Sequence, residues 1–294
     1  MITAENIFDN FKFTMSGLEK GLQVIHITTP AAQLLCCQHD DNIETVLARR
    51  DLKPFDQIPI KKQETIIGLL KKRECPKEAK GSVRDYLEPL GEKMLVSADT
   101  PLIEFIQNDS LDRIVIGGTK IYGLVTRSDL LKLPVSLLVF ALVTHVETLM
   151  LNMIRVTGIG KEEWLMWLKR GRRVDIQDRF EQLTSEQSDP DMLELTYFSD
   201  KKIILDRLGA LEECASLLPD KFFIDQLEEI RLLRNTISHT GNTSDKHNIL
   251  QKFIDRLLNT HRWIEGIEQW QKAKANTTHL YIEDDVFLAR RPLL

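Results

Sequence analysis

Arg234, Asn235 and His239 lie within six positions of one another and could share one chemical step. Histidine titrates near neutral pH, so it can act as a general acid or base. The guanidinium group of arginine can stabilise the negative charge of a phosphorane. The side-chain amide of Asn235 could orient the histidine or the arginine, or bind a phosphate oxygen. This combination suits cleavage of RNA without a metal, with the neighbouring 2′-hydroxyl as nucleophile.

The geometry of a helix constrains this set. Five residues turn about 140° beyond a full circle, so Arg234 and His239 do not share a face of a regular helix. Arg234 lies near the middle of an apolar stripe made of Phe223, Leu227, Ile230, Leu233 and Ile237. His239 can join it only if the helix ends around Ser238, which Gly241 favours, or if a second subunit completes the site.

A structural interpretation of the same residues stays open. Arg234 could be a buried arginine that pairs with Glu147 of an inner helix. His239 could be a histidine at a helix C-terminus, where the helix dipole favours a cation. Taken singly, each residue fits this structural interpretation, whereas their combination with Asn235 favours catalysis or a site that has lost it.

The elements that would position this set belong to a chain long enough for two domains. It has 294 residues, 43% of them apolar and 28% charged, which is typical of a soluble globular protein. The net charge of −5 excludes a general basic field for nucleic acid, so an RNA partner would need a local patch. Four cysteines without a CxxC pair and a start without signal-peptide character predict reduced thiols in the cytoplasm and no metal site.

The first half contains an internal repeat. Three blocks align in the same order: Leu35–Val46 with Met94–Phe105, Phe55–Ile60 with Leu111–Ile116, and Ile66–Leu70 with Ile121–Val125. Each copy is typical of a strand, a helix, two strands and a final helix. The final helices would begin at Lys71–Glu74 and at Thr126–Asp129.

The end of the second copy, Gly123 to Asp129, could bind a phosphorylated ligand. Gly123 would permit a tight turn between strands. Thr126 would lie at a helix N-terminus, where free N–H groups hold phosphate, and Arg127 would add charge. Asp129 could accept hydrogen bonds from a ribose diol. The alternative is an ordinary helix cap, with Thr126 as N-cap and Asp129 as a first-turn acid.

The repeat resembles a pair of CBS domains over about residues 20–135, most closely in MLVSADTPLIEFI, LDRIVI and GLVTRSDLL, with VRDYLEPL as a lead-in. The resemblance implies an adenine nucleotide, AMP or ATP-like, as a regulatory ligand. It also implies that Thr126 and Asp129 bind the ribose-phosphate. The first copy departs from the pattern, because Lys71 and Glu74 occupy the places of Thr126 and Asp129, which puts a ligand there in doubt.

The second half has helical periodicity only. Pro134 is expected to end the first domain, and an apolar helix is expected over 137–156, more typical of a buried helix than of a membrane span. A second helix is predicted over 161–173, ending in the basic run Lys169–Arg173. That run is either a phosphate-backbone contact or a solvated helix end whose cations the dipole favours. Ser199 or Asp200 is a candidate cap farther on.

The Arg-x4-His spacing, with LEEIRLL before it, resembles the HEPN family of all-α domains over about residues 136–270. The resemblance implies a homodimer in which the arginine and histidine of two subunits face one cleft, and in many members a metal-independent ribonuclease. Other members only bind.

We therefore expect an α+β chain with a tandem CBS pair in residues 1–135 and a HEPN-type all-α bundle in residues 136–294. The predicted function is that of a cytoplasmic endoribonuclease regulated by an adenine nucleotide, with Arg234, Asn235 and His239 as catalytic residues. The alternative is a nucleotide-sensing regulatory dimer without catalysis. RNA is a candidate partner, and neither a metal nor a membrane is expected.

Overall fold

The computed structural model describes residues 16–108, 110–186, 190–217, 227, 229–230, 232–233, 252, 254–260 and 262–274. The chain divides into two compact units, Met1–Leu138 and Val139–Leu294. In the described residues, the first unit contains the strands and the second contains helices only. The expected mixture of a sheet-bearing N-terminal half and a helical C-terminal half is confirmed.

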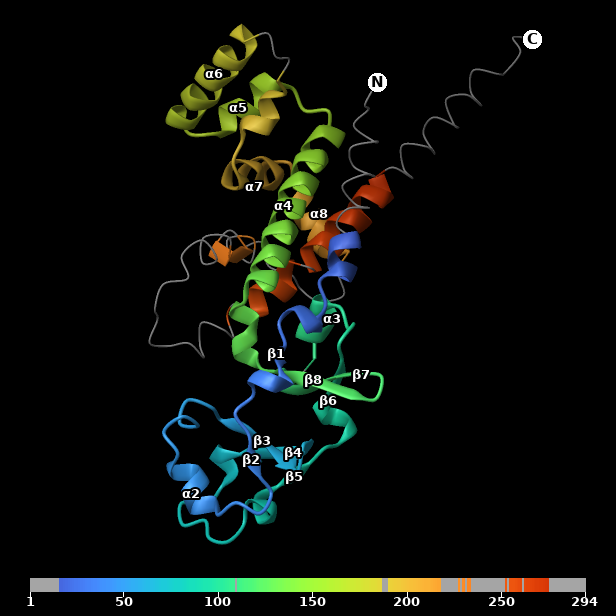
Figure 1. Cartoon of the computed structure of the whole chain (residues 1–294). Helices are drawn as coiled ribbons and strands as arrows, with labels where there is room; N and C mark the ends of the chain where they lie inside the picture. Colours follow the sequence, from blue (N-terminus) through green and yellow to red (C-terminus); the bar gives the residue numbers. More distant parts are fainter. Residues whose placement is uncertain are drawn as a thin grey trace, which may run out of the picture. The chain divides into compact units, whose positions relative to one another are not determined.

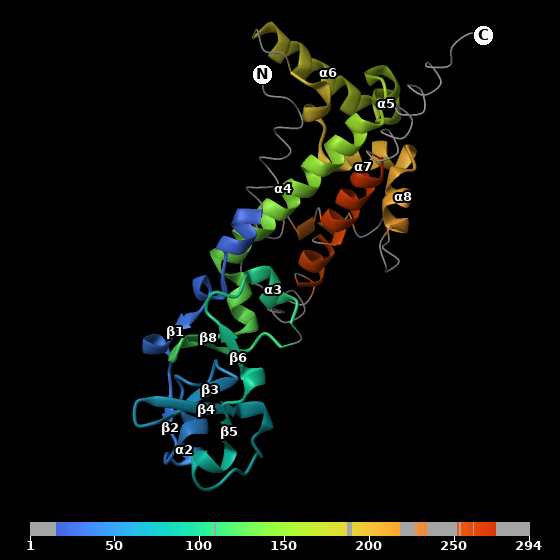
Figure 2. The same cartoon turned by 90° about the vertical axis from the view of Figure 1, so that its right-hand side faces the viewer.

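The first unit holds two four-stranded sheets, which both labelled views show as separate layers (Figures 1 and 2). One sheet has the order β2 (Cys37–Gln38), β3 (Gln57–Lys62), β4 (Thr65–Lys71), β5 (Glu88–Pro89). The other has the order β6 (Leu95–Ser97), β7 (Arg113–Gly117), β8 (Lys120–Val125), β1 (Thr29–Pro30). In each sheet one parallel pair is followed by two antiparallel pairs.

The predicted repeat is present in both its element order and its pairing. Each copy has a strand, a short helix (α2, Ile43–Ala48, or α3, Leu102–Ile106), a β-hairpin and a final turn of helix. The final turns are short 3-10 helices, η3 (Lys72–Glu74) and η6 (Arg127–Leu131), rather than the predicted α-helices.

The strand register corrects one alignment block. Ile60 pairs with Gly68, and Val115 pairs with Gly123 in the same way. The two glycines are equivalent, so Ile60 corresponds to Val115 and not to Ile116. Gln57 therefore corresponds to Asp112, one residue away from the alignment read from the sequence.

Each lead-in segment supplies an edge strand to the sheet of the other copy and not to the copy that it precedes. β1 lies before the first copy in the chain, yet it pairs with β8 of the second copy. β5 lies before the second copy and pairs with β4 of the first. Each edge strand is only two residues long, so each sheet depends on a short segment from outside its own copy.

Gly68 and Gly123 allow these edge strands to approach. A Cβ atom on Gly68 would lie 2.2 Å from the carbonyl oxygen of Glu88, and one on Gly123 would lie 2.0 Å from that of Thr29. Gly123 lies inside β8, whereas the hairpin turn contains Gly118 at φ 60°. The expected role of Gly123 in a tight turn is therefore wrong, and the close approach of a backbone explains it.

Alanine at Gly68 or Gly123 is expected to lower the free energy of unfolding by about 1–3 kcal/mol, because the edge strand must move away. Urea denaturation of Gly68→Ala, Gly123→Ala and the wild type measures this. Gly91→Ala is the matched control, since an added Cβ there meets no atom within 4 Å. Equal stability of all three variants would contradict this reading of the edge strands.

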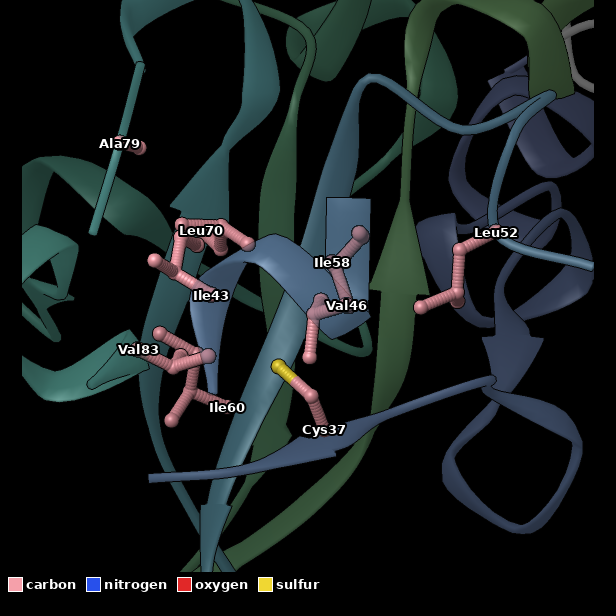
Figure 3. Packing of buried hydrophobic residues seen from close by; sticks show 9 residues of the cluster. All are labelled: Cys37, Ile43, Val46, Leu52, Ile58, Ile60, Leu70, Ala79 and Val83. Carbon is pink, nitrogen blue, oxygen red and sulfur yellow. The ribbon is translucent and has the colours of Figure 1, made fainter. Parts of the chain in front are cut away.

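Two apolar clusters hold the first unit together. The first lies under α2, where Figure 3 shows the Cys37 sulfur among aliphatic side chains such as Val46 and Ile58. Burial raises the pKa of the Cys37 thiol to about 12, so it stays protonated and packs as an apolar group. The second cluster joins the sheets, because Leu69 of β4 packs with Ile114 and Leu124 of the other sheet.

The described helices of the second unit begin with α4 (Leu133–Val156), which starts at the end of the first unit. Its start corrects the expectation that Pro134 would precede the helix. Pro134 is the second residue of α4, and proline is tolerated in a first turn because the amides there have no intrahelical partner. After the helix, Gly158 has φ 68° and forms the expected stop.

α4 meets the length and composition of a membrane span, with a mean hydropathy of 1.8. In the structure 61% of its apolar window is buried inside the protein.

The remaining named helices of this unit are α5 (Lys161–Trp167), α6 (Arg170–Ser185), η7 (Met192–Leu195), α7 (Phe198–Arg207) and α8 (Ala210–Ser216). Residues 254–260 and 262–274 are also helical. The prediction of one helix over 161–173 is wrong. Leu168 is extended and buries its side chain, so the chain breaks there and the basic run starts α6 instead of ending α5.

Candidate functional site

A pocket of about 620 Å³ lies between the two copies of the repeat. Its walls come from the ends of β3 and β4, from η3 and β5, and from the segments that precede β6 and β7. Four acids and four bases line it: Asp56, Glu74, Glu88, Asp112, Lys71, Arg73, Lys93 and Arg113. Leu69, Met94, Gln57 and Ser110 complete the lining. The pocket therefore combines an apolar wall with many charges.

Two of the bases are neutralised by acids of the same pocket. The Lys71 ammonium lies 2.7 Å from Glu88 Oε2 and 3.4 Å from Glu74 Oε1. The hydrogen bond to Glu88 is the main reason that the pKa of Lys71 is raised. Arg73 Nη2 lies 2.7 Å from Asp56 Oδ2. These pairs hold η3 and β5 against the end of β4.

The other two bases have no carboxylate partner among the described residues. Lys93 makes no ion pair there, and within the described structure the Arg113 guanidinium donates a hydrogen bond only to the backbone oxygen of Asp112, at 3.5 Å. An anion that entered the pocket could bind both cations without breaking an existing ion pair. Phosphate is such an anion, and arginine binds it through charge-assisted hydrogen bonds.

Gln57 and Asp112 meet across the pocket wall, as equivalent residues of two copies do at a pseudo-two-fold axis. Gln57 Nε2 donates to Asp112 Oδ2 at 2.8 Å, and the backbone N–H of Arg127 donates to Asp112 Oδ1 at 3.2 Å. Gln57 Oε1 is buried and has no hydrogen-bond partner. An unsatisfied buried acceptor costs about 1–3 kcal/mol, so a ligand that donates a hydrogen bond to it would gain affinity.

The residues predicted to bind the nucleotide form a helix cap. The backbone N–H and the hydroxyl of Thr126 donate to Asp129 Oδ2 at 2.7 and 2.9 Å. Asp129 is only 7% exposed, and its Oδ1 lies 2.8 Å from the Lys132 ammonium. Both carboxylate oxygens of Asp129 therefore have partners within the protein, as the alternative of an ordinary helix cap predicts.

None of Gly123, Thr126, Arg127 and Asp129 lines the 620 Å³ pocket. The structure brings Thr126, Arg127 and Asp129 together at the start of η6, whereas Gly123 lies in β8 beside β1. A nucleotide at these four residues stays a prediction.

Lys71 and Glu74 do line the pocket, although the departure of the first copy from the CBS pattern put a ligand there in doubt. They hold the places of Thr126 and Asp129 in the first copy, where the hydroxyl and the shorter acid are missing. The charged lining of Arg73, Lys93 and Arg113 gave no sequence signal, because it gathers from separate turns of the chain.

The predicted catalytic residues Arg234, Asn235 and His239 lie outside the described residues. The helix before them is described at Leu227, Ile230 and Leu233, and all three are fully buried. The apolar stripe expected there is confirmed at these positions.

The basic run forms part of a side-chain network. Lys169 is the N-cap of α6 and Arg170 its first residue, and both are exposed. Arg172 pairs with Asp175 and with the buried Asp200, and its guanidinium lies 3.9 Å from the centre of the Tyr197 ring. The run lies at the N-terminus of α6, where the helix dipole disfavours cations. The interpretation as a helix C-terminus whose cations the dipole favours is therefore wrong.

No protein-family model matches the chain. No curated protein matches it either. Among solved structures, the N-terminal part is similar to CBS domains. One is the CBS domain of the bacterial CNNM/CorC family Mg2+ transporter in complex with ATP, with 19% identity, a TM-score of 0.33, and coverage of 41% of this chain and 92% of that one. Another is the CBS domain of the same transporter family, with 17% identity, a TM-score of 0.33, and coverage of 42% and 80%.

Proposed function

We propose that the chain is a cytoplasmic regulatory protein whose first unit binds an adenine nucleotide in the pocket between its two repeats. One observation carries this proposal: two cations without a carboxylate partner, Lys93 and Arg113, line the same pocket as the unsatisfied amide oxygen of Gln57. Its volume of about 620 Å³ is within the range of small-molecule sites.

The chemistry of a nucleotide fits these groups. The phosphates would bind Lys93 and Arg113, and the purine ring would lie against Leu69 and Met94. The exocyclic amine of adenine would donate to Gln57 Oε1. The ribose hydroxyls would donate to a carboxylate of the pocket, such as Glu74.

Titration calorimetry tests the proposal with ATP, AMP, adenosine and ITP. We expect affinity to fall from ATP to adenosine as phosphates are lost, and to fall from ATP to ITP because an oxygen replaces the amine. An undetectable heat with millimolar ATP, together with an unchanged melting temperature, would overturn it.

The output of this regulation is proposed to lie in the helical unit. Arg234, Asn235 and His239 have the residue types and spacing of a metal-independent endoribonuclease that works as a homodimer. The alternative is a regulatory dimer that binds RNA or protein without cleaving it. This part of the proposal rests on the sequence motif and on the buried helix that leads to it.

RNA incubated with the protein in EDTA, with and without ATP, separates the two outputs. Cleavage that is lost in His239→Ala and kept in His26→Ala supports the ribonuclease. Cleavage that persists in His239→Ala contradicts it. A monomer in analytical ultracentrifugation, with no cleavage, would also exclude a site shared by two subunits.

A further inference from the structure

The two copies of the repeat differ in how they hold the first residue of their final 3-10 helix. In the first copy the N–H of Lys72 donates to the backbone oxygen of Asp56 at 2.9 Å. In the second copy the N–H of Arg127 donates to a side chain, Asp112 Oδ1, at 3.2 Å. A backbone link cannot respond to a ligand without moving the strand, whereas a carboxylate in a pocket wall can.

This difference also explains the unsatisfied atom. Gln57 is the equivalent of Asp112, and its Oε1 would accept the N–H of Lys72 if the copies were symmetric. The oxygen of Asp56 takes that hydrogen bond instead, so Gln57 Oε1 keeps no partner. Its Nε2 still donates to Asp112 Oδ2.

The backbone of η6 links Arg127 to further hydrogen bonds that reach the residue before α4. Arg127 is the first residue of η6, whose cap joins Thr126 and Asp129. Asp129 binds the ammonium of Lys132, which also donates to the backbone oxygen of Ile27 at 2.6 Å. Lys132 is the C-cap of η6, and the next residue begins α4.

We propose that Asp112 is the positioning residue that couples occupation of the pocket to the first turn of α4. The coupling rests on the proposed nucleotide site. A ligand donor at Gln57 Oε1 fixes the amide, the amide fixes the Asp112 carboxylate through Oδ2, and Oδ1 then holds the N–H of Arg127. Hydrogen bonds in such a chain strengthen one another, so ligand tightens η6 and the beginning of α4.

Hydrogen–deuterium exchange of the full chain, with ATP at a concentration that saturates each variant by calorimetry, tests the coupling. In the wild type we expect ATP to slow exchange in residues 128–137 by about tenfold, as for a local opening that becomes harder. In Asp112→Ala the slowing is lost while ATP still binds. Asp56→Ala is the matched control, because it removes a pocket carboxylate and keeps the backbone link to η3.

A second pair of variants isolates the N–H itself. Arg127→Ala and Arg127→Pro both remove the side chain, and only proline removes the donor. Proline suits the first position of a helix, and Thr126 before it has φ −131° and ψ 166°, which proline permits. We expect the slowing to persist in Arg127→Ala and to vanish in Arg127→Pro.

The outcomes separate this inference from the site on which it rests. Equal slowing in Asp112→Ala and in the wild type, or in both Arg127 variants, overturns the coupling and leaves the nucleotide site standing. If ATP binds the wild type but does not slow its exchange, the coupling is likewise overturned and the nucleotide site stands. ATP that does not bind the wild type overturns the site and the coupling together.

Discussion

Alanine in place of both Lys93 and Arg113 is expected to lower the affinity for ATP by at least about 100-fold, since each charge-assisted hydrogen bond contributes about 1.5–3 kcal/mol and tenfold in affinity is about 1.4 kcal/mol. Neither cation has a carboxylate partner in the described structure, so their removal leaves no buried acid unpaired. The protein should therefore keep its stability while it loses its ligand. Adenosine, which has no phosphate, should bind both proteins with similar affinity.

Titration calorimetry of the double variant with ATP, AMP and adenosine measures this effect. Lys120→Ala is the control, because Lys120 is an exposed lysine of β8 outside the pocket. If ATP binds the double variant as tightly as it binds the wild type, the phosphates do not lie at these cations. Loss of ATP binding in Thr126→Ala, with the double variant unaffected, would place the nucleotide at the cap of η6.

Asp200→Ala is expected to lower the free energy of unfolding by about 2–4 kcal/mol, the largest stability effect that we predict. Asp200 is 3% exposed and accepts hydrogen bonds from Arg172 and from the backbone N–H of Tyr197 at 2.9 Å. The hydrogen bond to Asp200 is the main reason that the pKa of Arg172 is raised. Without Asp200, the guanidinium keeps Asp175 as its one carboxylate partner, and the N–H of Tyr197, the N-cap of α7, loses its acceptor.

Urea denaturation followed by circular dichroism measures the loss. Asp206→Ala is the matched control, an exposed aspartate on the same helix. Asp200→Asn should recover part of the stability, because the amide oxygen can still accept the N–H of Tyr197. Equal stability of Asp200→Ala and Asp206→Ala would show that the network around Arg172 does not hold α6 to α7.

The repeat could be predicted from sequence because its signals are local. Alternating apolar residues define β3, β4, β7 and β8, and equivalent glycines mark β4 and β8. The alignment erred by one residue at Gln57 because it matched the similar pairs Phe55-Asp56 and Leu111-Asp112. The register shift lies at the equivalent step of both hairpins, so the strand pairing with Gly68 and Gly123 fixes the true correspondence.

The pocket could not be predicted in the same way. Its available cations lie before β6 and at the start of β7, and only folding brings them beside Lys71. The helical half shows a similar limit. Trp164 and Leu168 fit one helical stripe, so their apolar spacing gives no sign of the extended backbone at Leu168 that ends α5.

The swapped lead-in strands set an order for folding during synthesis. The sheet of the first copy needs β5, which the ribosome makes directly after β4, so this sheet can close early. The sheet of the second copy needs β1, which is made before the other described strands and must wait for β8. Closing that long loop has an entropic cost and is slow compared with local pairing. A nascent chain released before β8 would therefore expose an unpaired N-terminal strand, and a fragment that begins after β1 would lack the edge of its second sheet.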